Sequence, residues 1–120
     1  PLFAKAGMEE IKKYGDLPDY AERFGPRLIK DFKAIYGDAL ELTDDAEILD
    51  MLVRVKAENK LPRIYLTCGK DDAFMKEHEL FTGALDKMGI PYEFDKLEGA
   101  HEFQCFNEAL KRAIARFEGR

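Results

Sequence analysis

Two side chains with acid–base chemistry, Asp72 and His101, each follow a predicted strand and a glycine. The carboxyl ends of parallel strands meet at one edge of an open α/β sheet, so we expect both side chains on the same rim. A carboxylate that accepts the Nδ1–H of an imidazole fixes its tautomer and leaves Nε2 free to take a proton from a nucleophile. An acid followed by a histidine is the chain order of the last two members of a catalytic triad.

The nucleophile that such a pair would serve is absent, because the chain contains no serine. The Gly-x-Ser-x-Gly elbow, which also supplies an oxyanion-hole N–H, is therefore absent as well. Cys68 is a poor substitute, since it lies in or at the end of a strand, and Cys105 on a helix near His101 is a weak one. The favoured interpretation is two reduced, buried thiols, and their spacing leaves a disulfide open.

Structural roles compete with this chemistry. An aspartate after a strand commonly caps the next helix, and Asp71 or Asp72 could do only that. A histidine after Gly-Ala also suits an exposed loop. The strand–helix–strand placement of the pair favours a catalytic origin. We expect neither metal nor cofactor, because Asp71, Glu77 and His78 lack a ligand spacing, the glycines form no phosphate-binding loop, and His78 between two glutamates should be solvated.

Residues 61–120 are expected to form strand, helix, strand and helix, with strands over 64–68 and 92–97 and helices over 77–88 and 102–117. The first strand is mostly apolar, as in a parallel strand covered on both faces. A strand–helix–strand unit implies a right-handed crossover between parallel strands. Because two parallel strands do not make a sheet that stands alone, an unpaired edge should invite a partner.

Residues 1–60 are expected to contain only helices and loops. Pro26 is placed to begin a helix that Gly37 ends. Its apolar stripe consists of Leu28, Ile29, Phe32, Ile35 and Tyr36. A second helix is expected to begin near 43–45, where Asp44 and Glu47 have capping-box spacing, and a less regular helical stretch covers 8–14. The fold class is therefore α/β, as one incomplete domain with a helical cap or insertion at 1–60 and a βαβα segment at 61–120.

Composition limits the function classes. The 120 residues carry a net charge of -5 with scattered basic residues, which argues against nucleic-acid binding. No apolar run approaches the roughly 20 residues that span a bilayer. Two unpaired cysteines favour a cytoplasmic location. The chain begins at Pro1 rather than methionine, so a trimmed N-terminus is an open interpretation and the absence of a visible signal peptide says little.

Residues 61–72, LPRIYLTCGKDD, resemble the acid-bearing strand end of the esterase D-like family, which includes tributyrin esterases, S-formylglutathione hydrolases and some feruloyl esterases. Residues 89–94, GIPYEF, and 98–103, EGAHEF, resemble its final strand and histidine loop. Phe103 and Phe106 fit the aromatic pair that the family usually shows after the histidine. The sequence from 35–38 into the following Leu-rich helix is similar to the helical insertion before the penultimate strand.

This resemblance implies the C-terminal part of an α/β-hydrolase fold and of a serine carboxylesterase for short-chain acyl esters, with Asp72 as triad acid and His101 as base. Ala73 is smaller than the apolar residue usual there, and the missing elbow predicts that the chain alone is inactive. The implied partners are an ester substrate and an N-terminal half that carries the serine. The alternatives are a non-catalytic α/β module that self-associates through its sheet edge, and a cysteine hydrolase that uses Cys105 or Cys68.

Overall fold

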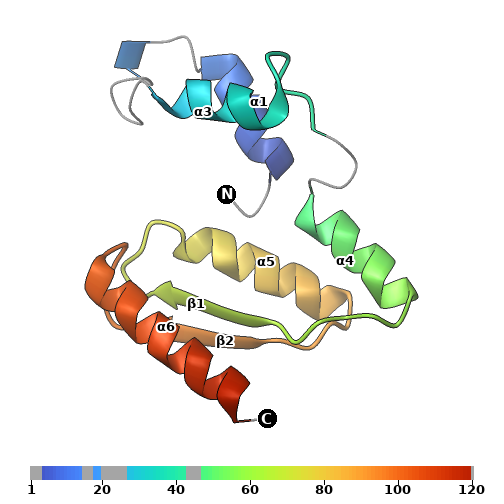
Figure 1. Cartoon of the computed structure of the whole chain (residues 1–120), viewed down its shortest axis with the longest axis vertical. Helices are drawn as coiled ribbons and strands as arrows, with labels where there is room; N and C mark the ends of the chain where they lie inside the picture. The colour runs from blue at the N-terminus through green and yellow to red at the C-terminus, as the bar shows by residue number, and fades with distance from the viewer. Residues whose placement is uncertain (1–3, 15–17, 20–26, 43–46, 120) are drawn as a thin grey trace. The chain divides into compact units, whose positions relative to one another are not determined.

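The computed structural model describes residues 4–14, 18–19, 27–42 and 47–119 (Figure 1). The chain divides into two compact units, Pro1–Val55 and Lys56–Arg120, which are described separately. Pro26, Thr43 and Asp44, at which helix starts were expected, lie outside the described residues. Within the described ranges, no helix is long and apolar enough to cross a bilayer.

The first unit contains helices α1 (Ala4–Tyr14) and α3 (Arg27–Tyr36) and most of α4 (Ile48–Ala57). Its core consists of Met8 and Ile11 of α1 together with Leu40. Partly buried side chains that pack against this core are Ile29, Phe32, Tyr36 and Leu42. The stripe expected on α3 is therefore largely correct, except that Ile35 is 68% exposed. Gly37 ends α3 at φ +83°, a conformation that glycine adopts readily.

Helix α4 begins at Ile48, later than the start expected near 43–45. Glu47 was expected in its first turn as part of a capping box. The residue instead precedes the helix, and its buried carboxylate accepts a 2.9 Å hydrogen bond from the backbone N–H of Lys5. The placement of Glu47 inside the helix was therefore wrong, because a partner far away in the sequence uses the carboxylate.

The second unit contains β1 (Tyr65–Gly69), α5 (Met75–Lys87), β2 (Glu93–Leu97) and α6 (Phe103–Glu118). The strands pair in parallel, with Tyr65 opposite Glu93 and Gly69 opposite Leu97. The predicted order of elements and the parallel crossover are confirmed, with element boundaries shifted by one or two residues. Within the described residues the sheet has two strands.

The two long helices of this unit cover opposite faces of the sheet (Figure 1). Successive side chains of a strand point to opposite faces, and β2 shows this directly. The Phe94 ring stacks on His78 of α5 at 5.9 Å, whereas the next side chain, Asp95, binds Arg116 of α6. Phe81 and Leu85, on the inner side of α5, are 1% and 0% exposed and form the centre of this layer.

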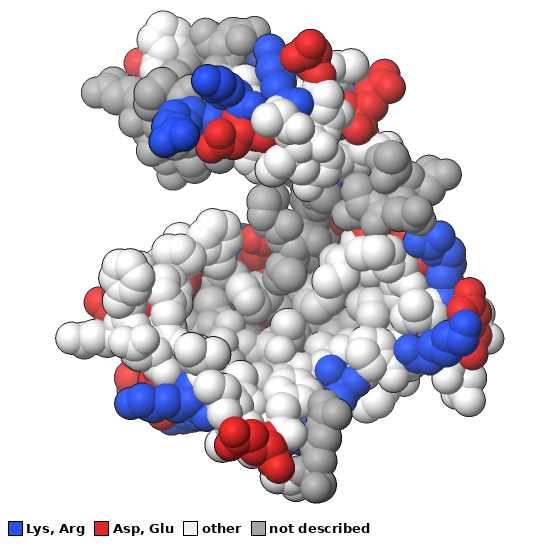
Figure 2. Space-filling view, viewed as in Figure 1, with Lys and Arg blue, Asp and Glu red and all other residues white. Residues whose placement is uncertain are grey.

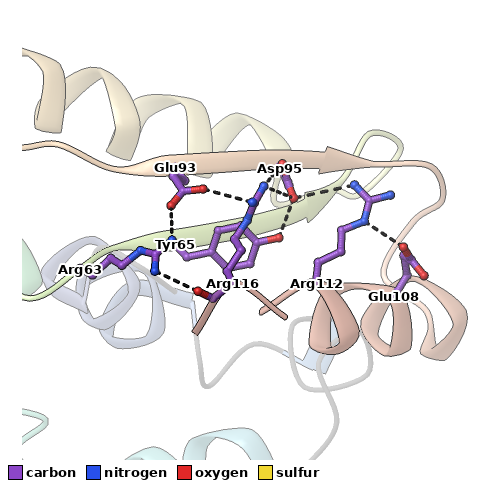
Figure 3. Close-up of polar contacts among 7 residues, drawn as sticks. All are labelled: Arg63, Tyr65, Glu93, Asp95, Glu108, Arg112 and Arg116. Carbon is purple, nitrogen blue, oxygen red and sulfur yellow. Dashed lines mark hydrogen bonds and ion pairs between the residues drawn. The ribbon is translucent and has the colours of Figure 1, made fainter. Parts of the chain in front are cut away.

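The α6 face of the sheet carries a polar network (Figure 3). Asp95 accepts a 2.6 Å hydrogen bond from the Tyr65 hydroxyl and bonds at 3.1 and 3.0 Å from Nη2 of Arg116. Arg116 also lies 3.2 Å from Glu93, which Arg63 contacts from the strand entrance at 2.9 Å. These contacts tie both strands to the last turns of α6 at a layer that apolar residues usually fill.

Asp95 makes the unfolding free energy of the second unit depend on pH. The Tyr65 hydroxyl and then the Arg116 guanidinium hold the pKa of Asp95 below its ordinary value. The carboxylate therefore contributes stability that is complete above about pH 4 and is lost as pH falls through the lowered folded-state pKa. Asp95→Asn should flatten the acid limb of unfolding free energy against pH, measured by urea unfolding between pH 2 and 6.

A matched control for this substitution is Glu118→Gln, which removes an exposed carboxylate from α6, the helix that carries Arg116. It should leave the shape of the acid limb close to that of the wild type. An acid limb that is unchanged in Asp95→Asn would show that the network does not link protonation to folding.

Candidate active site

Asp72 and His101 meet at the carboxyl ends of the paired strands. Nδ1 of His101 lies 3.0 Å from Oδ2 of Asp72. The Asp72 side chain is 5% exposed, whereas the His101 side chain is 62% exposed. In the tautomer that carries the proton on Nδ1, the imidazole donates to a buried carboxylate and presents Nε2 outward. The structure thus brings together the two residues that the sequence singled out.

Asp72 is held by the turn that leads into α5. Its Oδ1 accepts a 2.8 Å hydrogen bond from the backbone N–H of Phe74, and its own N–H donates to the carbonyl of Gly69 at 3.1 Å. Its carbonyl accepts from Met75 at the start of the helix. Asp72 therefore shapes the turn before the helix with one oxygen and contacts the imidazole with the other. It is not the N-cap of α5, because that position is occupied by Phe74 and has no side-chain cap hydrogen bond.

Backbone hydrogen bonds join the two loops that carry the pair. Lys70 N–H donates to Leu97 O at 2.8 Å, and Asp71 N–H donates to Gly99 O at 3.0 Å. A Cβ at position 69 would lie 2.4 Å from Gly99 O, so only glycine allows this approach. Gly99 itself has φ +110°, which other residues rarely adopt. These glycines bring the strand ends close enough for the side chains beyond them to meet.

A cavity of about 130 Å³ opens beside the pair. Besides Asp72 and His101, its walls include Thr67 of β1, His78 of α5 and Ala109 of α6. No residue of β2 lines the cavity, so it lies along the side of β1 that faces away from β2.

The two cysteines also line this cavity, and both are buried and free, which confirms the expectation of reduced thiols. Burial raises the pKa of the Cys68 thiol, and the Asp72 carboxylate and Cys105 raise it further. The thiolate is the nucleophilic form of cysteine, so this environment makes Cys68 a poor nucleophile. The geometry gives the cysteine-hydrolase alternative no support at Cys68.

His78, which was expected to be solvated, is partly exposed. Its Nδ1 lies 2.9 Å from the carbonyl of Phe74, and its ring stacks on Phe94 with an interplanar angle of 15°. The ring therefore packs against Phe94 of the sheet, and part of the side chain remains in solvent. In the part of the chain that the structure describes, no cluster of His, Cys, Asp and Glu side chains is arranged to hold a metal ion.

Comparisons with known proteins agree with this geometry. The chain is 27% identical over 85 residues to an acetyl esterase of Caldicellulosiruptor saccharolyticus. The match covers 69% of this chain and 32% of the relative, so the chain spans about a third of the length of this curated relative. A scan against protein-family models finds no match.

Two solved structures of hydrolases also resemble this chain. S-formylglutathione hydrolase FrmB from Staphylococcus aureus superposes with a TM-score of 0.54 at 30% identity, over 57% of this chain and 28% of that one. FphF, a fluorophosphonate-binding serine hydrolase of the same organism, gives a TM-score of 0.60 at 26% identity, over 69% and 33%. The fold is therefore a partial α/β-hydrolase fold. The proteins that this chain resembles within that class are esterase-like α/β-hydrolases.

The close approach of the strand ends predicts that any side chain at position 69 destabilises the protein. Gly69→Ala places a methyl group against the Gly99 backbone, so the loops must separate and the unfolding free energy should fall by about 1–3 kcal/mol. Gly83→Ala is the matched control, because an added Cβ there meets nothing within 4 Å and α5 should gain about 0.5–1 kcal/mol. Urea unfolding measures both, and equal stability of the two variants would contradict the constraint at Gly69.

Proposed function

We propose that this chain is the C-terminal part of a serine carboxylesterase that hydrolyses small, short-chain acyl esters. The observation that carries the proposal is the 3.0 Å contact between a buried carboxylate and an exposed imidazole at the ends of two neighbouring parallel strands. The similarity to an acetyl esterase and to two serine hydrolases supports it. The nucleophilic serine and the oxyanion hole would come from the part of the hydrolase fold that these relatives have and this chain lacks.

In the proposed reaction, Nε2 of His101 takes the proton of the serine hydroxyl as Oγ attacks the ester carbonyl. The imidazolium then gives that proton to the leaving alcohol, and an acyl-serine remains. A water molecule attacks the acyl-serine while His101 again accepts and returns a proton, which releases the acid and restores the serine. Asp72 keeps the imidazole in one tautomer and stabilises its charged form, a role that suits its burial and its bond to the Phe74 N–H.

The composition of the strands supports a partner at the free edge of β1. The strand β2, EFDKL, carries Glu93, Asp95 and Lys96, a composition typical of edge strands that resist further pairing. The strand β1, YLTCG, carries no charge. The cavity beside the active pair also lies along this uncharged strand. We therefore assign the free edge of β1 to the next strand of the hydrolase sheet, from the part that carries the serine.

Hydrogen exchange tests this assignment. Ile64 O and Lys70 N bond to β2, and alternate residues of a strand direct their backbone groups to opposite sides. The N–H of Cys68 should therefore face β2, whereas that of Thr67 should face the free edge. In the isolated chain the Thr67 amide should exchange at least tenfold faster than the Cys68 amide, measured by NMR. Equal protection of both amides would show that the edge is already covered.

The isolated chain should be almost inactive. Loss of the nucleophile from such a triad typically lowers turnover by a factor on the order of 10⁶, equivalent to about 8 kcal/mol of barrier. Hydrolysis of p-nitrophenyl acetate should then be no faster than with free imidazole at equal concentration. A rate of hydrolysis well above that of free imidazole, if His101→Ala abolishes it, would overturn the proposal that the nucleophile lies outside this chain.

A hybrid protein supplies the positive test. In it, this chain replaces the matching third of FphF, a serine hydrolase whose serine is retained. The hybrid should hydrolyse p-nitrophenyl acetate and react with a fluorophosphonate, and His101→Ala should lower ester turnover by a factor on the order of 10⁶ and slow the fluorophosphonate reaction. A folded hybrid whose activity is unchanged by His101→Ala would refute the role of His101.

Self-association is the second candidate function, and exposed apolar side chains on α6 favour it. Phe103, Leu110 and Ile114 are 84%, 60% and 47% exposed, and the free edge of β1 belongs to the same unit. A second copy could cover these groups without any catalysis. Light scattering separates the candidates, because a stable dimer of the isolated chain at micromolar concentration supports self-association and a monomer supports the missing-strand assignment.

A further inference from the structure

The imidazole of His101 is in contact with two phenylalanine rings. The ring centroid of Phe74 lies 5.4 Å from that of His101 with an interplanar angle of 54°. The ring of Phe106 lies at 4.9 Å and 82°, an edge-to-face arrangement. Phe74 immediately precedes α5, and Phe106 belongs to the first turn of α6. Two separate segments therefore contribute one aromatic contact each to the same imidazole.

The hydrogen bond to Asp72 does not by itself fix the direction of the imidazole. It holds one atom, Nδ1, while 62% of the side chain is exposed and water competes for the bond. A ring held at one atom can still pivot about the contact. Aromatic pairs prefer offset or edge-to-face geometry at centroid distances of about 4.5–7 Å. Both contacts lie within this distance; the Phe106 ring is edge-to-face and the Phe74 ring is tilted. Two such contacts restrict the plane of the ring, which the carboxylate leaves free.

Phe74 acts on both members of the pair. Its backbone N–H donates to Oδ1 of Asp72 at 2.8 Å, and its side chain contacts His101. Phe106 is placed by the start of α6, where its N–H donates to Glu102 O at 3.1 Å. The positions of acid and base thus depend on the same few residues at the entrances of two helices.

Burial alone does not explain where these two rings lie. Phe74 is 44% and Phe106 is 41% exposed, although phenylalanine is usually among the most buried residues. Figure 2 shows a surface that is mostly uncharged, with acidic groups at its margin, over the end of the second unit at which α5 and α6 begin. The rings remain partly in solvent at this surface, and there they contact the imidazole.

We propose that Phe74 and Phe106 are positioning residues that hold the imidazole of His101 in a single rotamer, with Nδ1 on Asp72 and Nε2 directed away from it toward the incoming nucleophile. The proposal rests on the proposed function of His101 as the base, and it adds the residues that orient it. Each ring contact should shift the rotamer ratio by about two- to tenfold.

NMR of the 120-residue chain tests the positioning directly. Three-bond couplings from the backbone to Cγ report the χ1 rotamers of His101, and His78 serves as an internal reference. The wild type should show one rotamer. Phe74→Leu and Phe106→Leu should each produce averaged couplings for His101, while Phe106→Tyr, which keeps the ring, should restore the single rotamer.

Phe103→Leu is the matched control. Phe103 lies in the same helical turn, contacts Phe106 at 6.3 Å and is 84% exposed. Its removal should leave the His101 couplings unchanged. A single rotamer in both Phe74→Leu and Phe106→Leu would overturn the proposal, as would an equal effect of Phe103→Leu. If a leucine variant does not fold by circular dichroism, the methionine variant at the same position replaces it, with the same expected averaging.

Kinetics of the hybrid esterase separate this proposal from the proposed function. Phe74→Leu and Phe106→Leu should each lower kcat by no more than about tenfold, the largest expected shift of the rotamer ratio, with little change in KM, because misdirection of a catalytic group affects the reacting geometry rather than binding. Averaged couplings in a hybrid that hydrolyses no ester would support the positioning and refute the esterase function. Ester hydrolysis with an unchanged kcat in both variants would refute the positioning and support the esterase function.

Discussion

The parallel pairing of β1 and β2 brings Asp72 close to His101. This is possible only because the backbone at Gly69 and the backbone at Gly99 can come into direct contact. Side-chain attraction contributes little to this meeting, since an exposed histidine gains only a small free energy from an ion pair. The strand register instead fixes the starting point of each loop, and the two short loops are joined by backbone bonds. A slip of one residue would turn every strand side chain to the opposite face and separate the pair. The meeting of Asp72 and His101 is therefore a consequence of backbone geometry.

The network of Tyr65, Asp95 and Arg116 holds the last turns of α6 against the sheet, at the opposite end of the helix from Phe106. Partly buried ion pairs are weak evidence for stability, because desolvation offsets much of the attraction. Their value here lies in direction, since Nη2 of Arg116 bonds both oxygens of Asp95 while Nη1 contacts Glu93, and the guanidinium is thereby held at two of its nitrogens. Fixing the last turns of α6 on both strands also fixes the rotation of the helix. Its first turn, which carries Phe106, is thereby presented to the histidine loop.

The composition of the second unit supports the proposal that its two strands form one end of a larger sheet. One strand carries the charges of an edge, the other is uncharged, and the cavity beside the active pair lies along the uncharged one. Apolar residues of α6 are exposed on the same unit. The relatives are about three times as long as the region they share with this chain. These observations fit an acid–base pair that is preformed, with its nucleophile supplied from elsewhere.

The sequence alone determined the order of strands and helices in the second unit, the parallel crossover and the burial of both cysteines. It also identified Asp72 and His101 as the candidate site residues. Those features follow from periodicity, glycine positions and turn chemistry, which act over a few residues. Only the tertiary structure decided that Glu47 precedes α4, that His78 packs on the sheet, that Asp95 and Arg116 fill one face and that two phenylalanines contact the imidazole. Each of these depends on a neighbour distant in sequence or on the position of a ring at a helix entrance, and a local pattern does not specify either.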